Sequence, residues 1–391
     1  MDIRLSNRVM AVAPSATMAM TAKAAELKAR GVNVIAFAAG QPDFDTPDNV
    51  KEQAIAALRA GDTKYPSPVS GTPKLREAIR GYFERFSGLN YAPSQICATV
   101  GAKDALHLGF AALLNPGDEV IIPAPYWVSY PDQVRLCDGK PVIVTPAKGL
   151  KITADELEAA ITSRTRVVVL NSPSNPSGAV YSRAELEALA GVMRKTDGVV
   201  VFADEIYHRL LLTGEPYVSF AARDGMYERT LTINGVSKTY AMTGWRLGFA
   251  AGPEPLIKAM AKLQGQTTSG PTSFVQTASV EALTGDQKAV DEMLVAFKRR
   301  GKLMADGLNA LPGVTCEQPG GAFYCFPDVS GTFAKLGVND ADGFSELALE
   351  RAHVATVSGV AFGAPTHARL SFATSDADIV EGLRRIGEML R

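Results

Sequence analysis

The sequence predicts an α/β fold, with a mostly parallel sheet in a large lobe and a smaller second lobe. Three observations point to this class. Short apolar runs rich in β-branched residues recur through the middle of the chain, each followed by turn residues and then by a helical pattern. The 391 residues exceed what one compact core usually serves. Beyond about residue 284 the alternation of strands and helices gives way to a long charged helical pattern, followed by a glycine-containing stretch.

The predicted strands are apolar on both faces, which is typical of strands buried in a parallel sheet. They span residues 96–100, 119–122, 142–145, 166–170, 199–203 and 230–234. Ligands of open parallel sheets bind beyond the carboxyl ends of the strands. The polar residues that follow each run are therefore the first candidates for a functional site.

Helices are predicted between these strands, at 102–114 and 182–195. Ser182 and Glu185 form a capping-box pattern, which favours a helix start at Ser182. The predicted second lobe begins beyond residue 284. It comprises a long charged helix over 286–311, strands over 322–326 and 369–373, and a final helix over 376–390.

The composition argues against several classes of protein. Basic and acidic residues number 40 and 41, so nothing indicates a surface for nucleic acid or membrane. The four scattered cysteines form no CxxC pair, which argues against a zinc site or a disulfide framework and fits a reducing compartment. The first 20 residues lack an apolar signal segment, and no apolar run approaches the ~18 residues of a membrane span. We expect a cytoplasmic protein without a metal, whose partners are small molecules or its own copies.

The segment 235–248 places Lys238 just after a predicted strand and Arg246 eight residues later. A lysine in a partly desolvated pocket near another cation loses basicity and becomes a nucleophile toward an aldehyde. An arginine nearby can bind a phosphate with two parallel hydrogen bonds. The alternative for any such pair is two surface cations on a loop.

The segment 235–248 resembles the Schiff-base lysine signature of class I pyridoxal-phosphate-dependent aminotransferases at each defining position. The resemblance extends from Ser15 to the C-terminus and is closest to the bacterial aspartate aminotransferase branch. It implies the type I pyridoxal-phosphate fold, with a seven-stranded, mostly parallel sheet in a large domain over 42–285. A smaller α+β domain would be built from 1–41 and 286–391. The implied cofactor is pyridoxal 5'-phosphate, held by Lys238.

The resemblance also assigns roles around the cofactor. Asp204 would pair with the pyridine nitrogen, where a buried carboxylate keeps the ring protonated and electron-withdrawing. Tyr207 and Asn175 would contact the phenolic oxygen. Lys238, Asp204 and Tyr207 would thus be the catalytic residues. The remaining cofactor contacts implied are Gly101, Ala102, Lys103, Trp127, Ser237 and Arg246.

Two of these cofactor contacts have features of their own. Ala102 departs from the second glycine that close relatives often have in the phosphate loop. Lys103 lies in the first turn of the helix predicted over 102–114, where a cation opposes the helix dipole and a nearby anion would relieve it. That anion is either the cofactor phosphate or a second carboxylate on the substrate. A solvated lysine is the alternative.

Substrate contacts follow from the same resemblance. Arg369 would clamp the α-carboxylate with its planar fork, although a structural ion pair is its ordinary role. Lys103 would bind the distal carboxylate of a dicarboxylic substrate. The other implied substrate contacts are Gly40, Trp127, Asn175, Ser15 and Thr17. Tyr65, with Thr268 or Ser269, would reach the cofactor of a neighbouring subunit, which implies a homodimer with shared active sites.

The predicted function is an aminotransferase of amino acid metabolism and biosynthesis. It would move the amino group of an L-amino acid, aspartate above all, to a 2-oxo acid such as 2-oxoglutarate by a ping-pong mechanism. An enzyme of the same fold with another specificity is the first alternative: an aminotransferase for aromatic or other amino acids, or a β-lyase. A non-catalytic ligand sensor is the distant alternative, and no basic DNA-binding segment precedes Ser15.

Overall fold

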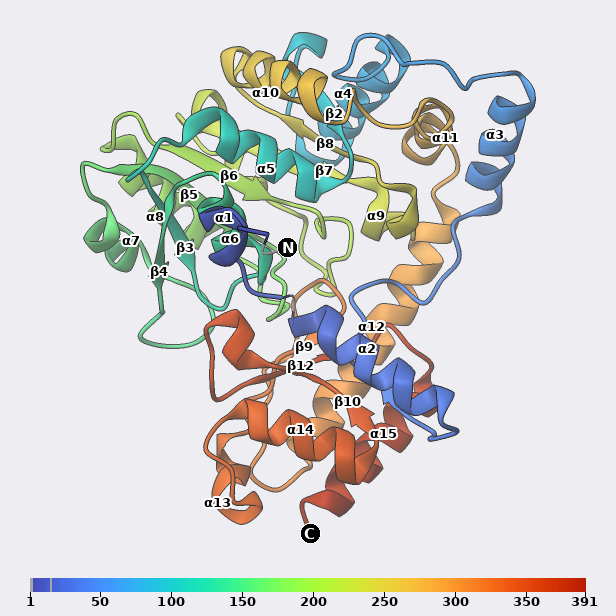
Figure 1. Ribbon diagram of the computed structural model, residues 1–391, viewed down its shortest axis with the longest axis vertical. Helices are drawn as coiled ribbons and strands as arrows, with labels where there is room; N and C mark the ends of the chain where they lie inside the picture. Colours follow the sequence, from blue (N-terminus) through green and yellow to red (C-terminus); the bar gives the residue numbers. More distant parts are fainter. Residues whose placement is uncertain (1–2, 15) are drawn as a thin grey trace.

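The computed structural model describes residues 3–14 and 16–391, and a seven-stranded sheet flanked by helices forms its larger lobe (Figure 1). The strand order is β2-β8-β7-β6-β5-β3-β4. All neighbours from β7 to β4 run parallel, while β8 is antiparallel to both β2 and β7. The strands are β2 Ile96–Thr99, β3 Glu119–Pro123, β4 Lys140–Val144, β5 Thr165–Asn171, β6 Val200–Asp204, β7 Thr230–Gly235 and β8 Gly248–Ala251. The predicted α/β class with a mostly parallel sheet is confirmed.

The sheet is buried on both faces because successive side chains of its central strands enter different cores. In β5, Val167 and Val169 pack in the core beneath α5 and α10, whereas Val168 and Leu170 pack in the core beneath α8. This alternation explains the unbroken apolar runs in the sequence. Each of the six strands predicted for this sheet matches an observed strand, and its ends differ from the observed ends by at most two residues.

Helices cover both faces of this sheet, and several begin at a side-chain cap. Ser182 accepts a hydrogen bond from Glu185 N and completes the predicted capping box, as Thr153 and Glu156 do for α7. The helices up to the second lobe are α1 Asn7–Met10, α2 Ala16–Ala29, α3 Asp48–Arg59, α4 Pro73–Ser87, α5 Ala102–Leu113, α6 Ser129–Leu136, α7 Ala154–Ala160, α8 Arg183–Arg194, α9 Val236–Thr239, α10 Glu254–Thr267 and α11 Ser273–Thr284.

The smaller lobe contains the C-terminal part of the chain, as predicted. Its long helix α12 runs from the sheet lobe into the smaller lobe, where it packs on α15 (Figure 1). The elements of this lobe are α12 Lys288–Asn309, α13 Phe333–Leu336, α14 Ala341–Ala352, α15 Asp376–Met389, β9 Tyr324–Cys325, β10 Val354–Ala355, β11 Val357–Ser358 and β12 Ala368–Ser371. The antiparallel order β11-β12-β9 replaces the two longer strands that were predicted at 322–326 and 369–373.

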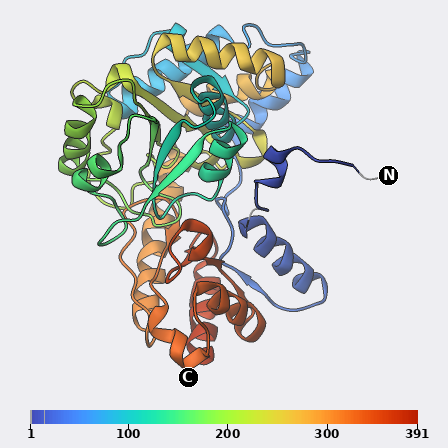
Figure 2. The same ribbon diagram turned by 60° about the vertical axis from the view of Figure 1, so that its left-hand side comes forward.

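The segment from α2 to β1 lies against the smaller lobe, whereas α1 contacts α6 of the larger lobe. Strand β1 Ile35–Ala36 pairs in parallel with β10, and α2 contacts β10 and β11. Before α1 the chain points away from both lobes (Figure 2). The pairing of β1 with β10 agrees with a small domain built from both ends of the chain. The boundaries of that domain near residues 41 and 286 stay a prediction.

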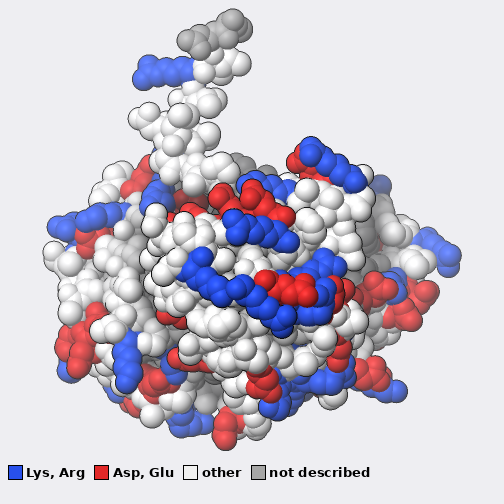
Figure 3. Space-filling model, turned by 90° about the horizontal axis from the view of Figure 1, so that it is seen from below, with Lys and Arg blue, Asp and Glu red and all other residues white. Residues whose placement is uncertain are grey.

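The surface and the interior show two further features of the described residues. Acidic and basic side chains are interspersed over the face formed by the smaller lobe (Figure 3). Among residues 3–14 and 16–391, no helix is long and apolar enough to cross a membrane, and no cluster of His, Cys, Asp and Glu side chains could hold a metal ion.

Candidate active site

A pocket of about 510 Å³ lies at the carboxyl ends of the parallel strands, between the sheet and the smaller lobe. It brings together side chains that are far apart in the sequence. The predicted site residues that line it are Thr17, Gly40, Ala102, Lys103, Trp127, Asn175, Asp204, Tyr207, Ser237, Lys238, Arg246 and Arg369. The pocket therefore lies where the sequence predicted it, beyond the carboxyl ends of the parallel strands.

Lys238 lies on the short helix α9, directly after the buried strand β7. Its Nζ donates a hydrogen bond to the carbonyl oxygen of Gly40 over 2.6 Å. Burial lowers the pKa of the Lys238 amine to about 8, and the positive charges of Arg369 and Arg246 act in the same direction. An amine with this pKa is partly unprotonated near neutral pH, which makes it a nucleophile and a general base.

Asp204 ends β6 and lines the pocket. Its Oδ2 accepts a hydrogen bond from the Tyr130 hydroxyl over 2.6 Å, and its Oδ1 accepts one from Ile206 N over 3.3 Å. Burial raises the pKa of the Asp204 carboxyl to about 6, while the bond from Tyr130 opposes that rise. The carboxyl can therefore hold a partner's proton near neutral pH.

Sequence reasoning missed Tyr130, which lies on α6 three residues after Trp127. Its ring packs edge-on against the Trp127 ring, with the centroids 5.3 Å apart. The available signal was its position in the helix that follows the predicted site residue Trp127. A tyrosine at such a position is more often an ordinary core residue, so the sequence alone could not single it out.

Arg369 lies on β12 and is 1% exposed, so its charge is almost fully withdrawn from water. Nη1 donates to Asn175 Oδ1 and Nη2 donates to the Ala38 carbonyl oxygen, each over 3.0 Å. The guanidinium also faces the rings of Tyr324 and Phe362. Its Nε has no hydrogen-bond partner among the described residues. A buried cation with neutral partners is costly unless an anion joins it, which fits a carboxylate ligand.

The opposite end of the pocket can hold an anion at the N-terminus of α5. Gly101 precedes this helix with a φ of +85°, and a Cβ there would lie 2.5 Å from Arg246 Nη2. Gly248 on β8 lets this turn cross closely, because a Cβ at Gly248 would collide with the backbone of Ala102. Helix N–H groups beside an arginine are suited to a phosphate. Gly101 itself does not line the pocket.

Lys103 and Trp127 line the same pocket side by side. The Lys103 ammonium lies 5.0 Å from the centre of the Trp127 ring. Burial lowers the pKa of Lys103, and the charge of Arg246 lowers it further. Among the described residues, no carboxylate forms an ion pair with Lys103. Its charge is available to a ligand.

Tyr207 and Tyr324 complete the wall between the lobes. Their hydroxyl oxygens are 3.1 Å apart. Tyr207 follows β6, whereas Tyr324 lies on β9 of the smaller lobe. Tyr324 was not among the predicted site residues, because its position in a short apolar strand resembles any core tyrosine.

The remaining predicted contacts lie outside this pocket. Tyr65 is 90% exposed, Thr268 is exposed and Ser269 is half-buried. Ser15 lies outside the described residues, whereas Thr17 lines the pocket from α2. The roles proposed for Tyr65, Thr268 and Ser269 at a neighbouring subunit stay predictions.

The residues present fit pyridoxal phosphate. One pocket is lined by a carboxyl group that can protonate a ring nitrogen, by the start of α5 with N–H groups suited to an anion, and by a lysine of lowered pKa. The flat face of Trp127 and the polar tips of Asn175 and Tyr207 surround the same space. The fold and this arrangement define the class of pyridoxal-phosphate enzymes with a mostly parallel α/β sheet.

Comparison with known proteins gives the family. The sequence profile of the aminotransferases of class I and II matches residues 32–386. The aspartate/prephenate aminotransferase of Nitrosomonas europaea is 46% identical over 397 residues, covering 99% of this chain and 100% of that protein. The crystal structure of the aspartate aminotransferase from Rhizobium meliloti has a TM-score of 0.95 at 45% identity, covering 100% of this chain and 99% of that one.

A second solved structure, the aspartate aminotransferase from Thermus thermophilus with maleate, has a TM-score of 0.93 at 44% identity. It covers 99% of this chain and 100% of that one. The chain belongs to the class I and II aminotransferases. As a member it is a pyridoxal-phosphate-dependent transaminase with amino acid and 2-oxo acid substrates, and the predicted class of enzyme, its fold and its cofactor are confirmed.

Proposed function

We propose that this transaminase prefers L-amino acids with two carboxylates, with aspartate as the main amino donor and 2-oxoglutarate as an acceptor. One observation carries the proposal: the pocket that contains Lys238 is also lined by two cations from different elements, the buried Arg369 on β12 and the more exposed Lys103 on α5. A substrate with a carboxylate at each end can neutralise both. A substrate with one carboxylate makes no charge-assisted hydrogen bond to Lys103 and so forgoes that part of the binding energy.

The chain's own groups suit the proton transfers of transamination. Bound pyridoxal phosphate supplies an aldehyde that takes up the amino group and a ring that withdraws electrons from the substrate Cα. Arg369 would hold the α-carboxylate and so orient the Cα–H bond. Lys238 Nζ would take the Cα proton and later return it, because its pKa of about 8 suits a base near neutral pH. Asp204 would hold a proton on the ring nitrogen.

The names of the relatives support a dicarboxylic substrate. The Nitrosomonas europaea protein is named for aspartate and prephenate, and the Thermus thermophilus structure contains maleate, a dicarboxylate. An enzyme for aromatic or other amino acids, or a β-lyase, remains the alternative to be tested. In that case Lys103 would be a solvated lysine beside Trp127, with no effect on the choice of substrate.

Paired kinetics on Lys103 variants test the proposal. We expect Lys103→Met to raise KM for L-aspartate about 10-fold to 100-fold, since a charge-assisted hydrogen bond to a carboxylate is worth about 1.5–3 kcal/mol. KM for L-phenylalanine should change less than about 3-fold, because that substrate lacks a second carboxylate. Equal effects on both substrates would refute the role of Lys103 while leaving the transaminase activity in place. Lys335→Met, on the outer helix α13, is the matched control.

Three further parts of the proposal concern the whole molecule. The functional unit would be a homodimer in which Tyr65 and Thr268 or Ser269 reach the partner's cofactor, which suits the 90% exposure of Tyr65. The domains would divide at residues 42 and 286, which suits the pairing of β1 with β10. The compartment would be the cytoplasm, which suits the four free cysteines.

A further inference from the structure

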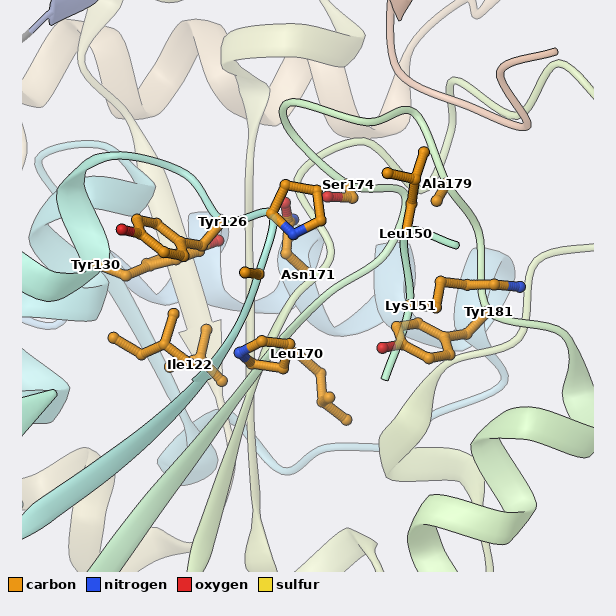
Figure 4. Close-up of a pocket in the computed structure, with 14 residues that line it drawn as sticks. Ile122, Tyr126, Tyr130, Leu150, Lys151, Leu170, Asn171, Ser174, Ala179 and Tyr181 are labelled. Carbon is orange, nitrogen blue, oxygen red and sulfur yellow. The ribbon is translucent and has the colours of Figure 1, made fainter. Parts of the chain in front are cut away.

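Asn171 occupies a position between two groups of site residues that no assigned role explains. It ends β5 and pairs in register with Asp204 at the end of β6. Its half-buried side chain lines the active-site pocket and also a second, small cavity of about 20 Å³. Figure 4 shows this cavity, with Asn171 close to Ser174 and with Tyr126 and Tyr130 on the left-hand side.

The Asn171 amide bonds to the backbones of two different segments. Its Nδ2 donates to the carbonyl oxygen of Asp204 over 2.9 Å, and its Oδ1 accepts from the backbone N–H of Asn175 over 2.8 Å. A carbonyl can only accept and a backbone N–H can only donate. The orientation of the amide is therefore fixed by its partners, and no other natural side chain of this length offers one donor and one acceptor on a planar end.

The two segments carry the residues assigned to opposite parts of the cofactor ring. Asn175 also accepts a hydrogen bond from Arg369 at its Oδ1, so a continuous chain of bonds links Asp204, Asn171, Asn175 and Arg369. We propose that Asn171 is a positioning residue that sets the separation of Asp204 and Asn175 and, through Asn175, the orientation of Arg369. This inference rests on the roles proposed above for Asp204 and Asn175.

The small cavity beside Asn171 affects the choice of substitutions, because water can enter it when the side chain is shortened. A cavity of about 20 Å³ has room for one water molecule, so Asn171→Ala would let water replace the lost amide. Asn171→Leu keeps the same branched shape and number of heavy atoms, with a larger volume, and offers neither a donor nor an acceptor. Asn171→Asp keeps the acceptor for Asn175 N but places an oxygen against the Asp204 carbonyl oxygen, which breaks only one of the two bonds.

The first test is hydrogen–deuterium exchange of the holoenzyme, resolved to Asn175 N–H by fragmentation of a peptide spanning 172–178. We expect Asn171→Leu to lower the protection of Asn175 N–H about 10-fold or more, because its hydrogen-bond acceptor is lost. Asn171→Asp should retain that protection. Unchanged protection in Asn171→Leu would show that Asn171 does not hold this segment and would overturn the proposal.

The second test is kinetic and spectroscopic. In both variants we expect kcat with L-aspartate to fall about 10-fold to 100-fold, since misplacement near the reacting atoms costs rate. KM should change less than about 3-fold in Asn171→Asp, which keeps the bond to Asn175 N, and should rise in Asn171→Leu, which also releases Asn175 and Arg369. The absorption maximum of the bound cofactor should shift as well. If Asn171→Leu does not fold, Asn171→Asp still tests the proposal, because a wild-type kcat and spectrum in that variant would overturn it.

Two comparisons separate this inference from the assumptions beneath it. Ser177→Ala is the matched control, because it removes another side-chain bond in the same loop, from Ala179 N to Ser177 Oγ, without touching Asn175 N. Its kcat should stay within about 2-fold of wild type. Full activity of Asn175→Ala and Asp204→Ala would refute the roles of those residues, while the exchange result would still decide whether Asn171 holds the segment.

Discussion

The Tyr130 hydroxyl donates a hydrogen bond to Asp204 Oδ2 over 2.6 Å, and both side chains are buried. The bond joins α6 to the end of β6 across 74 residues of sequence. It opposes the effect of burial on the Asp204 carboxyl and so favours the charged form. The state of Asp204 therefore depends on a tyrosine that no local pattern marks as part of the site.

Tyr130→Phe removes this donor and keeps the ring. We expect the pKa of the Asp204 carboxyl to rise further and kcat with L-aspartate to fall about 10-fold to 100-fold at pH 7–8, because a hydrogen bond to a charged group is worth about 1.5–3 kcal/mol. Steady-state kinetics between pH 6 and 9 measure the effect. Tyr126→Phe, nearby in the wall of the small cavity, is the control and should stay near wild type. A wild-type pH profile in Tyr130→Phe would contradict the account.

Asp204→Asn should stabilise the cofactor-free protein. The folded-state pKa of Asp204 is raised to about 6, so between its ordinary pKa and pH 6 the folded protein keeps a proton that the unfolded chain releases. The contribution of Asp204 to the free energy of unfolding therefore falls as pH rises through that window. Above pH 6 the protein keeps the full cost of burying the charged carboxylate. The variant should gain about 1–3 kcal/mol at pH 7–8 and little near pH 4. Urea unfolding at both pH values measures this, with exposed Asp45→Asn as control. No gain at pH 8 would contradict the raised pKa.

Arg369→Met should raise the pKa of Lys238. The charge of Arg369 is the next cause after burial for the lowered pKa of this amine, so its removal favours the protonated form. The rate at which the cofactor-free protein takes up pyridoxal phosphate, followed by absorbance against pH, should have its midpoint near pH 8 in wild type and at higher pH in the variant. Arg384→Gln on the outer face of α15 should leave the midpoint unchanged. A midpoint that stays in place in Arg369→Met would mean that the two cations do not interact.

Subunit mixing tests whether Tyr65 acts at a partner's site. Lys238→Ala and Tyr65→Ala proteins should each be impaired alone. If Tyr65 reaches across, a mixed dimer has one site with both defects and one intact site, so an equal mixture should recover about a quarter of wild-type activity after subunit exchange. Mixing Lys238→Ala with Asp204→Ala is the control, because every mixed dimer then keeps one defect in each site. Equal activity of the two mixtures would argue against a shared site.

The sequence predicted the elements whose signals are local. Strands β5 and β6 contain apolar runs, over 167–170 and 200–203, because both faces of the sheet are covered. Asp204 and Asn175 come after these runs, and the family resemblance assigned their roles. Strand β8 was missed. Its sequence, Gly-Phe-Ala-Ala, has mostly small side chains and weak strand propensity. This segment is a strand because it pairs with β2 on one side and β7 on the other, which the local sequence does not indicate.

The parts of the site that depend on distant contacts could not be predicted. The carbonyl oxygen of Gly40 accepts from Lys238 across 198 residues, although the local sequence around Gly40 indicates only a turn. Tyr324 meets Tyr207 across 117 residues and the two lobes. Such pairs are set by how the lobes pack, which no periodicity records.

The central claim is that Lys238 is the residue that holds pyridoxal phosphate. The direct measurement is borohydride reduction of the holoenzyme, followed by proteolysis and mass spectrometry of the peptide that carries the cofactor. The account predicts one modified residue, Lys238, and loss of the modification when the holoenzyme is first converted with excess L-aspartate. A cofactor found on Lys103 or another lysine, or no covalent cofactor after incubation with pyridoxal phosphate, would contradict it.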